Sequence, residues 1–174
     1  MEILFKANSF PNTLNTLMGI ESNYLLRIGD ANIPNNQLQV ATSVNNCTSA
    51  DLQLESGKWY HVAVAFNKGN VKVYINGVEK FSGSTGKSSV SLGAKHTNEE
   101  DGSRCFWVGY SYKDDRYFDG VVSEVRIWNR ALTAEEIQAT NHFYTVEPES
   151  EGLIAYWKFD EGSGTVAKDY SVSG

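Results

Sequence analysis

The chain has few of the residues that small domains use as covalent or metal staples. Its 174 residues include only two cysteines, Cys47 and Cys105, and three histidines. These are too few for a disulfide framework or for a zinc site with paired ligand spacing. The two cysteines either form one bridge or stay as thiols, and we favour two thiols. A chain of this length buries enough surface to fold without a staple.

Basic runs and long hydrophobic runs are also missing. The 15 Lys and Arg residues stand against 21 Asp and Glu residues, which gives a net charge of −6. Nucleic acids and anionic membranes are bound through basic patches, so we expect no nucleic-acid partner. No apolar stretch approaches the roughly 20 residues of a membrane-spanning helix, so we expect no membrane insertion by this segment. The charge balance favours a neutral ligand.

Proline is scarce, with three residues against 15 glycines. This composition is typical of many tight turns and not of a low-complexity tract. Domains usually hold about 100–200 residues, so residues 1–174 are expected to form a single domain. The sequence enters a strand-like "EILFKANSF" at once and stops abruptly at "KDYSVSG". We therefore expect a module that is part of a longer protein.

Strand periodicity is the dominant signal in the chain. In "GKWYHVAVAFNKGNVKVYINGVEKF", residues 57–81, bulky apolar residues occupy every second position. Asn76-Gly77 is the preferred dipeptide of a type I′ hairpin turn, because both residues tolerate positive φ. The segment therefore predicts a three-stranded antiparallel meander. Short β-branched and aromatic runs predict further strands at 3–7, 17–20, 23–28, 37–42, 105–112, 121–128 and 153–159.

One short helix is predicted after Leu132. Thr133 and Glu136 have the spacing of a capping box, and the apolar pattern continues for only about two turns. Many short strands with one short helix indicate an all-β, two-sheet antiparallel jelly-roll sandwich. Residues 153–159 carry an alternating apolar face, and we expect the acidic link "EPESEG" to bring this last strand back across the sandwich.

Several motifs in order resemble the laminin-G-like, concanavalin A-like lectin/glucanase superfamily. They are "GKWYHVAVAF", "VKVYINGV", "FWVGYS", "FDGVVSEVRIWNRALTAEEI" and "GLIAYWKFDEGSG", and "MGIESNYLLRIGD" adds to a narrower match. The chain is similar, more narrowly, to sandwich modules of bacterial glycan-utilisation lipoproteins and multidomain glycoside hydrolases. The resemblance implies a concanavalin A-like sandwich over the whole chain. It also implies an extracytoplasmic location, in the periplasm or on the outer-membrane surface, and other domains of the same polypeptide as partners.

Retaining glucanases of this fold carry a Glu-x-Asp-x-x-Glu strand motif, in which two carboxylates act about 5–5.5 Å apart. Here Glu124 matches its first position, but Arg126 and Asn129 stand at the other two. The resemblance therefore implies a chain that is not an enzyme of this type. We expect Glu124 to pair with Arg126, or with a neighbouring strand, on a solvated face. His61 shares one side of its strand with the small residues Ala63 and Ala65 and is expected to be structural.

No cofactor is expected, although some relatives of this fold bind calcium at the rim of the sandwich. Acidic residues cluster at 99–101, and again at Asp114, Asp115 and Asp119. Neither cluster has the Asp-x-Asp-x-Asp-Gly rhythm of a calcium loop. Solvated loop charges are the favoured reading, and calcium is the alternative.

Sugar-binding sites combine aromatic platforms with hydrogen-bonding side chains, so outward-facing aromatic residues are the candidates. With Val121, Val125 and Ile127 read as core, Glu124 and Arg126 point outward, and the same parity turns Tyr74 and Trp107 outward. The loop at 110–120 adds polar and aromatic groups at the edge. Trp59 and Trp128 are expected to pack under loops or the helix. The predicted carbohydrate-binding residues are Tyr74, Trp107, Tyr112, Asp114, Arg116, Tyr117, Glu124 and Arg126.

The sequence thus favours a non-catalytic, lectin-like accessory module of an extracytoplasmic bacterial glycan-processing protein, with an oligo- or polysaccharide as its partner. The first alternative is a structural spacer or protein-interaction module without glycan affinity. A glycoside hydrolase is the less favoured alternative.

Overall fold

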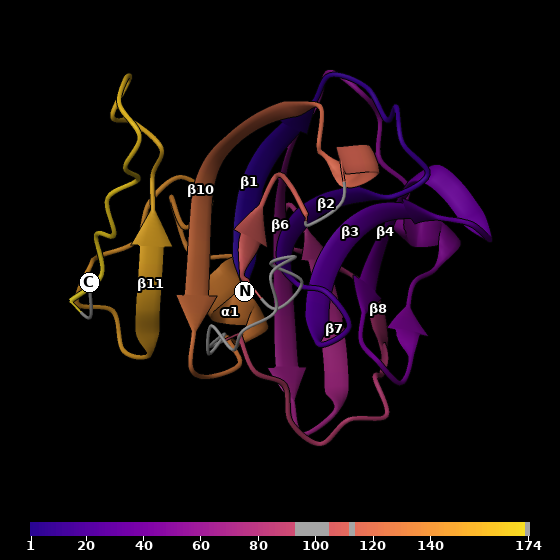
Figure 1. The fold of residues 1–174 in the computed structure, drawn as a ribbon. Coiled ribbons are helices and arrows are strands. Elements are labelled where there is room, and N and C mark those ends of the chain that lie inside the picture. Colours follow the sequence, from indigo (N-terminus) through magenta and orange to yellow (C-terminus); the bar gives the residue numbers. More distant parts are fainter. Residues whose placement is uncertain (93–104, 112–113, 173–174) are drawn as a thin grey trace.

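The computed structural model describes residues 1–92, 105–111 and 114–172, apart from the side chain of Asp114. Two antiparallel sheets pack face to face (Figure 1), which confirms the predicted sandwich. The six-stranded sheet has the order β11-β10-β1-β6-β7-β8. Its strands are β1 Glu2–Ala7, β6 Trp59–Asn67, β7 Asn70–Ile75, β8 Val78–Ser84, β10 Gly120–Trp128 and β11 Leu153–Trp157.

The second sheet has five strands in the order β5-β4-β3-β2-β9. Its members are β2 Asn15–Ile20, β3 Tyr24–Asp30, β4 Ile33–Ala41, β5 Asn46–Cys47 and β9 Trp107–Val108. Non-consecutive neighbours in both sheets, such as β1 between β10 and β6, give the crossing connections of a jelly roll. The chain therefore relies on pairings between residues far apart in sequence.

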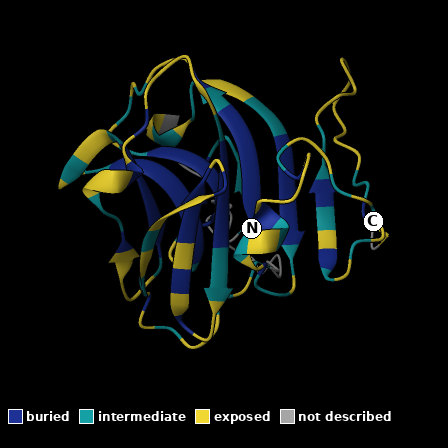
Figure 2. Cartoon of the chain, turned by 180° about the vertical axis from the view of Figure 1, so that it is seen from behind, coloured by how far each residue is buried: buried dark blue, intermediate teal, exposed yellow. Residues whose placement is uncertain are grey.

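The hydrophobic core lies between the two sheets and follows the predicted alternation. Ile3 and Phe5 of β1 are fully buried, and Leu26 and Ile28 of β3 face them from the other sheet. Seen from behind in Figure 2, buried residues fill the middle strands, while exposed residues gather in the turns. The period-2 pattern therefore identified which side of most strands is buried.

The predicted meander is present as β6, β7 and β8. Asn76 and Gly77 form its second turn with φ values of 49° and 76°, as a type I′ turn requires. The side-chain oxygen of Asn76 also accepts a hydrogen bond of 2.8 Å from the backbone N–H of His61. This turn therefore fixes the register of β7 and β8 and also supports the middle of β6.

A β-bulge in β10 changes which residues face the core. Leu4 pairs with Glu124 and Phe5 with Val122, so Ser123 is an extra residue between them. Val122 packs against the core, whereas Val121 is 45% exposed. The prediction that Val121 belongs to the core is therefore wrong, because the bulge shifts the alternation by one residue.

Two predicted elements are shorter than expected. The strand predicted at 105–112 is reduced to β9, because Gly109 adopts φ 70° and its carbonyl accepts the N–H of Phe118, which turns the chain away. Helix α1, Ala134–Ile137, is one turn long and not two. The structure adds two short 3-10 turns at Ala50–Leu52 and Asp114–Arg116.

The last strand returns as predicted, since β11 pairs with β10 at the edge of the six-stranded sheet. Leu153 is buried, but Phe159 lies beyond the strand and is exposed. Within the described residues, Cys47 and Cys105 are not joined by a disulfide, which confirms the reading as thiols.

Helix α1 is held in place by its N-terminal cap. Thr133 accepts the backbone N–H of Glu136, and the Glu136 carboxylate accepts the N–H of Thr133 at 2.8 Å. Arg130 binds the same carboxylate with two hydrogen bonds of 2.7 and 2.9 Å. The Arg130 contact and the cap lower the pKa of Glu136 to about 2. The carboxylate therefore stays ionised through the physiological range.

We predict that Thr133→Ala lowers the free energy of unfolding by about 1 kcal/mol, the usual cost of losing a Thr cap. Urea unfolding at neutral pH would measure the change. Thr165→Ala is the matched control, because Thr165 is exposed and lies far from the helix in sequence. Equal stability of the two variants would show that the cap does not hold α1.

Candidate functional site

The outer face of the six-stranded sheet is partly covered by the chain that follows β10. Helix α1 packs Ile137 against Ala63 and Tyr74 of this face. Further along, Phe143 stacks on His61 with ring centroids 4.7 Å apart. Side chains on this outer face are therefore divided into a covered group and an open group, and sequence parity does not separate them.

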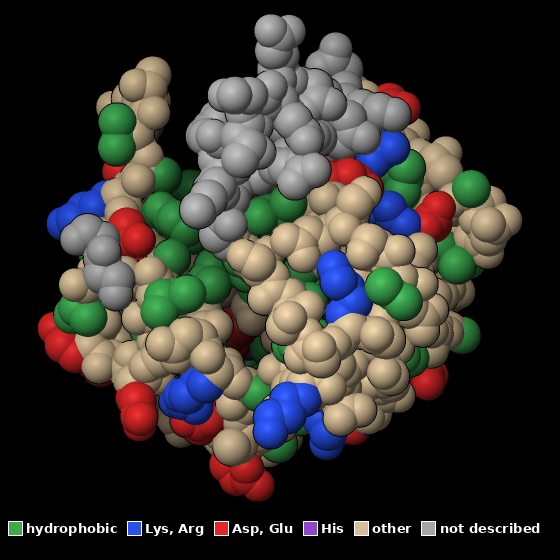
Figure 3. All heavy atoms as spheres, turned by 60° about the horizontal axis from the view of Figure 1, so that its bottom comes forward, with side chains coloured by type: hydrophobic (Ala, Val, Ile, Leu, Met, Phe, Trp, Pro, Cys, Tyr) green, Lys and Arg blue, Asp and Glu red, His purple; other side chains and the backbone are tan. Residues whose placement is uncertain are grey.

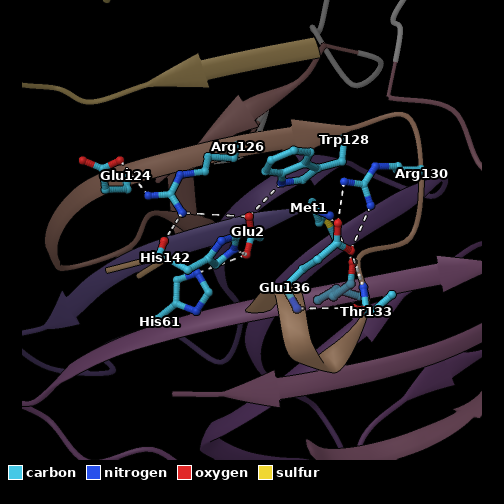
Figure 4. Close-up of polar contacts among 11 residues, drawn as sticks. Met1, Glu2, His61, Glu124, Arg126, Trp128, Arg130, Thr133, Glu136 and His142 are labelled. Atoms are coloured by element: carbon cyan, nitrogen blue, oxygen red, sulfur yellow. Dashed lines mark hydrogen bonds and ion pairs between the residues drawn. The ribbon is translucent and has the colours of Figure 1, made fainter. Parts of the chain in front are cut away.

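The covered group is centred on the carboxylate of Glu2 in β1 (Figure 4). One carboxylate oxygen, Oε2, accepts a hydrogen bond of 2.7 Å from Trp128 Nε1, and the other, Oε1, lies 2.7 Å from His142 Nε2. His61 Nε2 lies 3.3 Å from that second oxygen, and Arg126 Nη1 lies 3.9 Å from Oε2. All these groups converge on one carboxylate that is 2% exposed.

Burial and contacts set the charge states of this group. Burial alone would raise the pKa of Glu2, but the hydrogen bonds from His142 and the nearby His61 hold it far below its usual range. The pKa of His61 is lowered, mainly by burial, although the Glu2 carboxylate opposes that effect. Glu2 is therefore ionised and His61 neutral at pH 7, and the fixed positive charge of Arg126 balances the carboxylate.

Glu124 pairs with Arg126, as predicted, at 3.0 Å between Oε2 and Nη2. The expected solvated face is wrong, because Arg126 has no exposed surface and Glu124 is only 8% exposed. Arg126 Nη1 also donates to the backbone oxygen of His142 at 2.6 Å, and its guanidinium lies over the ring of Tyr156. Residues 139–145 and β11 cover these side chains, so neither one offers a surface to a ligand.

Tyr74 is also covered. It lies on the outer side of the sheet, as its parity predicts, but α1 packs over it and it is 3% exposed. Its hydroxyl donates to Glu79 at 3.3 Å. The prediction that Tyr74, Glu124 and Arg126 line an open surface is therefore wrong.

The remaining predicted residues lie in a different part of the molecule. Trp107 belongs to β9 in the five-stranded sheet, where its ring meets Tyr110 edge-on at 5.4 Å. Arg116 pairs with Glu21 at 2.7 Å, and Tyr117 is 43% exposed. Tyr112 and the side chain of Asp114 lie outside the described residues. The predicted set therefore does not form one surface, because Trp107 and Tyr74 are in different sheets.

An open groove on the outer face of the six-stranded sheet contains Trp59, which was expected to be packed, together with Phe143 and Tyr144. Its volume is about 520 Å³, and Trp59 and Tyr144 are 46% and 66% exposed at its sides. The prediction that Trp59 packs under a loop is therefore wrong. The groove is lined by Leu4, Trp59, His61, Asn76, Ser123, Phe143 and Tyr144.

Other hollows are less suited to a polar ligand. Hydrophobic side chains gather at the end of the sandwich where β6 and β10 finish, with acidic and basic side chains interspersed around them (Figure 3). A cavity of about 680 Å³ there is lined mainly by apolar groups, including Phe66, Phe106 and Trp157. Another cavity, of about 650 Å³ beside α1, has polar walls. The one aromatic residue described in its lining is Tyr74, whose ring is buried.

The described carboxylates of the second acidic cluster contact protein groups, and Asp115 lies 3.9 Å from Arg116 Nε. Both carboxylate oxygens of Asp119 accept hydrogen bonds, from Asn8 and from Ser9. The cluster at 99–101 lies outside the described residues. Glu2, His61 and His142 place potential metal ligands within 4.8 Å of one another. Their carboxylate, however, already accepts Trp128 and is balanced by Arg126, so the group fits a hydrogen-bonded network better than a metal site.

The fold and these features describe a two-sheet sandwich with a structural ion-pair network and an aromatic surface groove. The chain belongs to the concanavalin A-like lectin/glucanases superfamily, whose family model matches residues 2–138. None of the described helices has the length and apolar character to cross a membrane.

Two solved structures and one curated protein are similar to this chain. A protein from Bacteroides ovatus proposed to bind carbohydrate is 31% identical, with a TM-score of 0.79 over 97% of this chain and 48% of its own. Domain 4 of an extracellular GH43 arabinanase from Geobacillus stearothermophilus, solved with arabinotriose, is 26% identical, with a TM-score of 0.54 over 79% of this chain and 63% of its own. Human adhesion G-protein coupled receptor D1 is 34% identical over 85 residues, which are 45% of this chain and 8% of the receptor. The chain thus spans about half of the Bacteroides protein and a small part of the receptor.

We predict that Arg126→Met destabilises the fold by about 3–5 kcal/mol, because it leaves the buried carboxylates of Glu2 and Glu124 without their counter-charge. Chemical denaturation would measure this loss. Lys80→Met removes an exposed cation of the same sheet and is expected to change stability little. A similar loss in both variants would contradict a special role for the buried charge.

We also predict that stability falls as the pH drops below the ordinary His value of 6.5. Below that pH the unfolded chain binds a proton at His61 and the folded chain does not, because folding lowers the pKa of His61. Protonation therefore favours the unfolded state. Glu2 adds a further loss below its ordinary value of 4.5, because its folded pKa is also lowered. Urea unfolding at pH 7.5 and 5.5 would show the first effect. His61→Gln should weaken it, with the remainder due to the Met1 amine, whose pKa burial lowers to about 6. An unchanged pH dependence would contradict the assignment to His61, which faces Glu2, Arg126 and His142.

Proposed function

We propose that this chain is a non-catalytic, carbohydrate-binding accessory module of a larger extracytoplasmic protein that processes glycans. The observation that carries the proposal is the similarity, over almost the whole chain, to a Bacteroides protein proposed to bind carbohydrate. The similarity to an arabinanase domain solved with arabinotriose supports the same ligand class. Because one fold hosts many functions, the proposal also needs a suitable surface, and the exposed aromatic groove supplies one.

The absence of catalysis is supported by the surroundings of Glu124. A retaining glycosidase needs a nucleophile and an acid/base carboxylate that both face the substrate. Glu124 is buried and paired with Arg126, and Arg126 and Asn129 occupy the positions where glucanases of this fold carry the other carboxylates. A carboxylate that is buried and paired with a guanidinium does not face a substrate, so this strand is suited to hold the fold and not to cleave a glycosidic bond.

A larger protein is supported by the share of the Bacteroides chain that the match leaves uncovered. An extracytoplasmic location is supported by the arabinanase, which is extracellular. The groove suits a neutral ligand and binding without a metal, because the residues described in its lining include uncharged side chains and no carboxylate. The uncharged ones are Trp59, Asn76, Ser123 and Tyr144.

The test is binding of the isolated domain to arabinotriose and to a panel of plant and host oligosaccharides, measured by calorimetry. We expect selective binding of a neutral glycan that EDTA does not change, with no new reducing ends after long incubation. Failure to bind any member would favour the structural spacer. Release of reducing ends would favour a hydrolase.

A further inference from the structure

We propose that the groove between Trp59 and Tyr144 on the outer face of the six-stranded sheet is the saccharide-binding site, and that it takes a neutral sugar unit stacked on the Trp59 indole. This inference rests on the proposed function, because it names the site for that ligand class. It differs from the sequence-based prediction, which placed the site around Trp107 and the loop at 110–120.

Two aromatic residues of the groove, Trp59 and Tyr144, are exposed and lie outside the core. Trp59 and Tyr144 are among the most exposed aromatic side chains described, at 46% and 66%, although Tyr144 is held by its neighbour Phe143. Phe143 is in turn fixed by stacking on His61. Large aromatic side chains cost free energy when they face water, so two of them beside one groove indicate a ligand surface.

The indole of Trp59 is held in a defined position. Lys6 Nζ lies 5.6 Å from the centre of its ring, which is a cation–π contact on the outer face of the sheet. Lys6 pairs directly with Trp59 across β1 and β6, and on its other side with Val121. A restrained aromatic ring loses little freedom on binding, so it is a better platform than a mobile one.

Polar groups occur beside the aromatic ones in the groove. The bulge in β10 places Ser123 in the lining, and the β7–β8 turn contributes the exposed Asn76. The side-chain oxygen of Asn76 already accepts the N–H of His61, which leaves its NH₂ group to donate toward the groove. A hydroxyl and an amide next to aromatic faces match the alternating hydroxyls and C–H faces of a sugar.

The charges around the groove favour a neutral sugar over an acidic one. The nearby carboxylates of Glu2 and Glu124 are committed to Arg126, Trp128 and His142. Arg126 is fully buried by these contacts and has no exposed surface for a ligand carboxylate. Lys6 lies over the Trp59 ring but is not part of the groove lining, so recognition within the groove depends on stacking and on uncharged hydrogen bonds.

The experiment compares two variants of the groove with two matched variants elsewhere. Trp59→Ala and Tyr144→Ser remove the groove aromatics, whereas Trp107→Ala and Tyr117→Ser remove the same residue types from the β9 and 110–120 region. Each is titrated with arabinotriose and with the panel glycans that the wild-type domain binds. We expect both groove variants to weaken binding about tenfold or more, the effect of truncating an anchor residue, and both control variants to bind like the wild type.

The outcomes distinguish a failure of the proposed function from a failure of the proposed site. If the wild-type domain binds no glycan, the proposed function is overturned, and the groove is then read as a contact surface for a neighbouring domain. Binding that survives in the groove variants, or that is lost in Trp107→Ala or Tyr117→Ser, overturns the site and keeps the function. Thermal unfolding of each variant identifies a folding defect. Tyr144→Ser keeps the test valid if Trp59→Ala does not fold, because Tyr144 is largely exposed.

Discussion

The buried carboxylate of Glu2 is the constraint on which the outer half of the structure depends. It lies on β1, in the middle of the six-stranded sheet, and receives contacts from β6, from β10 and from the chain after α1. An ionised group in such a place is tolerated only when each lone pair is satisfied and a counter-charge is near. The network therefore selects one arrangement in which residues 139–145 lie across the sheet, and that arrangement also builds a wall of the groove.

The fold was largely predictable because its signals are local. Alternation identified the strands, the Asn76-Gly77 dipeptide identified a hairpin, and the Thr133–Glu136 spacing identified the helix cap. The failures also have local causes that a pattern does not reveal. A glycine with positive φ ended the strand at β9, and one inserted residue at Ser123 exchanged the sides of Val121 and Val122.

The candidate site was less predictable than the fold. Odd and even positions along a strand indicate which side of the sheet a residue faces, but not which segments cover that side. Tyr74 and Arg126 do lie opposite the core, yet α1 and residues 139–145 bury both. Trp59 was read as packed, yet it stays open because the covering chain passes beside it. Strand order had the same effect on Trp107, since only tertiary structure shows that β9 joins the second sheet.

Two nearby residues after α1 differ in their surroundings. His142 anchors the segment, because its ring contacts Glu2 and its carbonyl accepts a hydrogen bond from Arg126. Tyr144, two positions later, is largely exposed to solvent. If the groove is the saccharide site proposed above, selection on stability acts on His142 and selection on ligand preference acts on Tyr144. With that site, a lineage of such modules would diversify in the sugars it recognises by exchanging a single exposed side chain, while the scaffold beneath it stays the same.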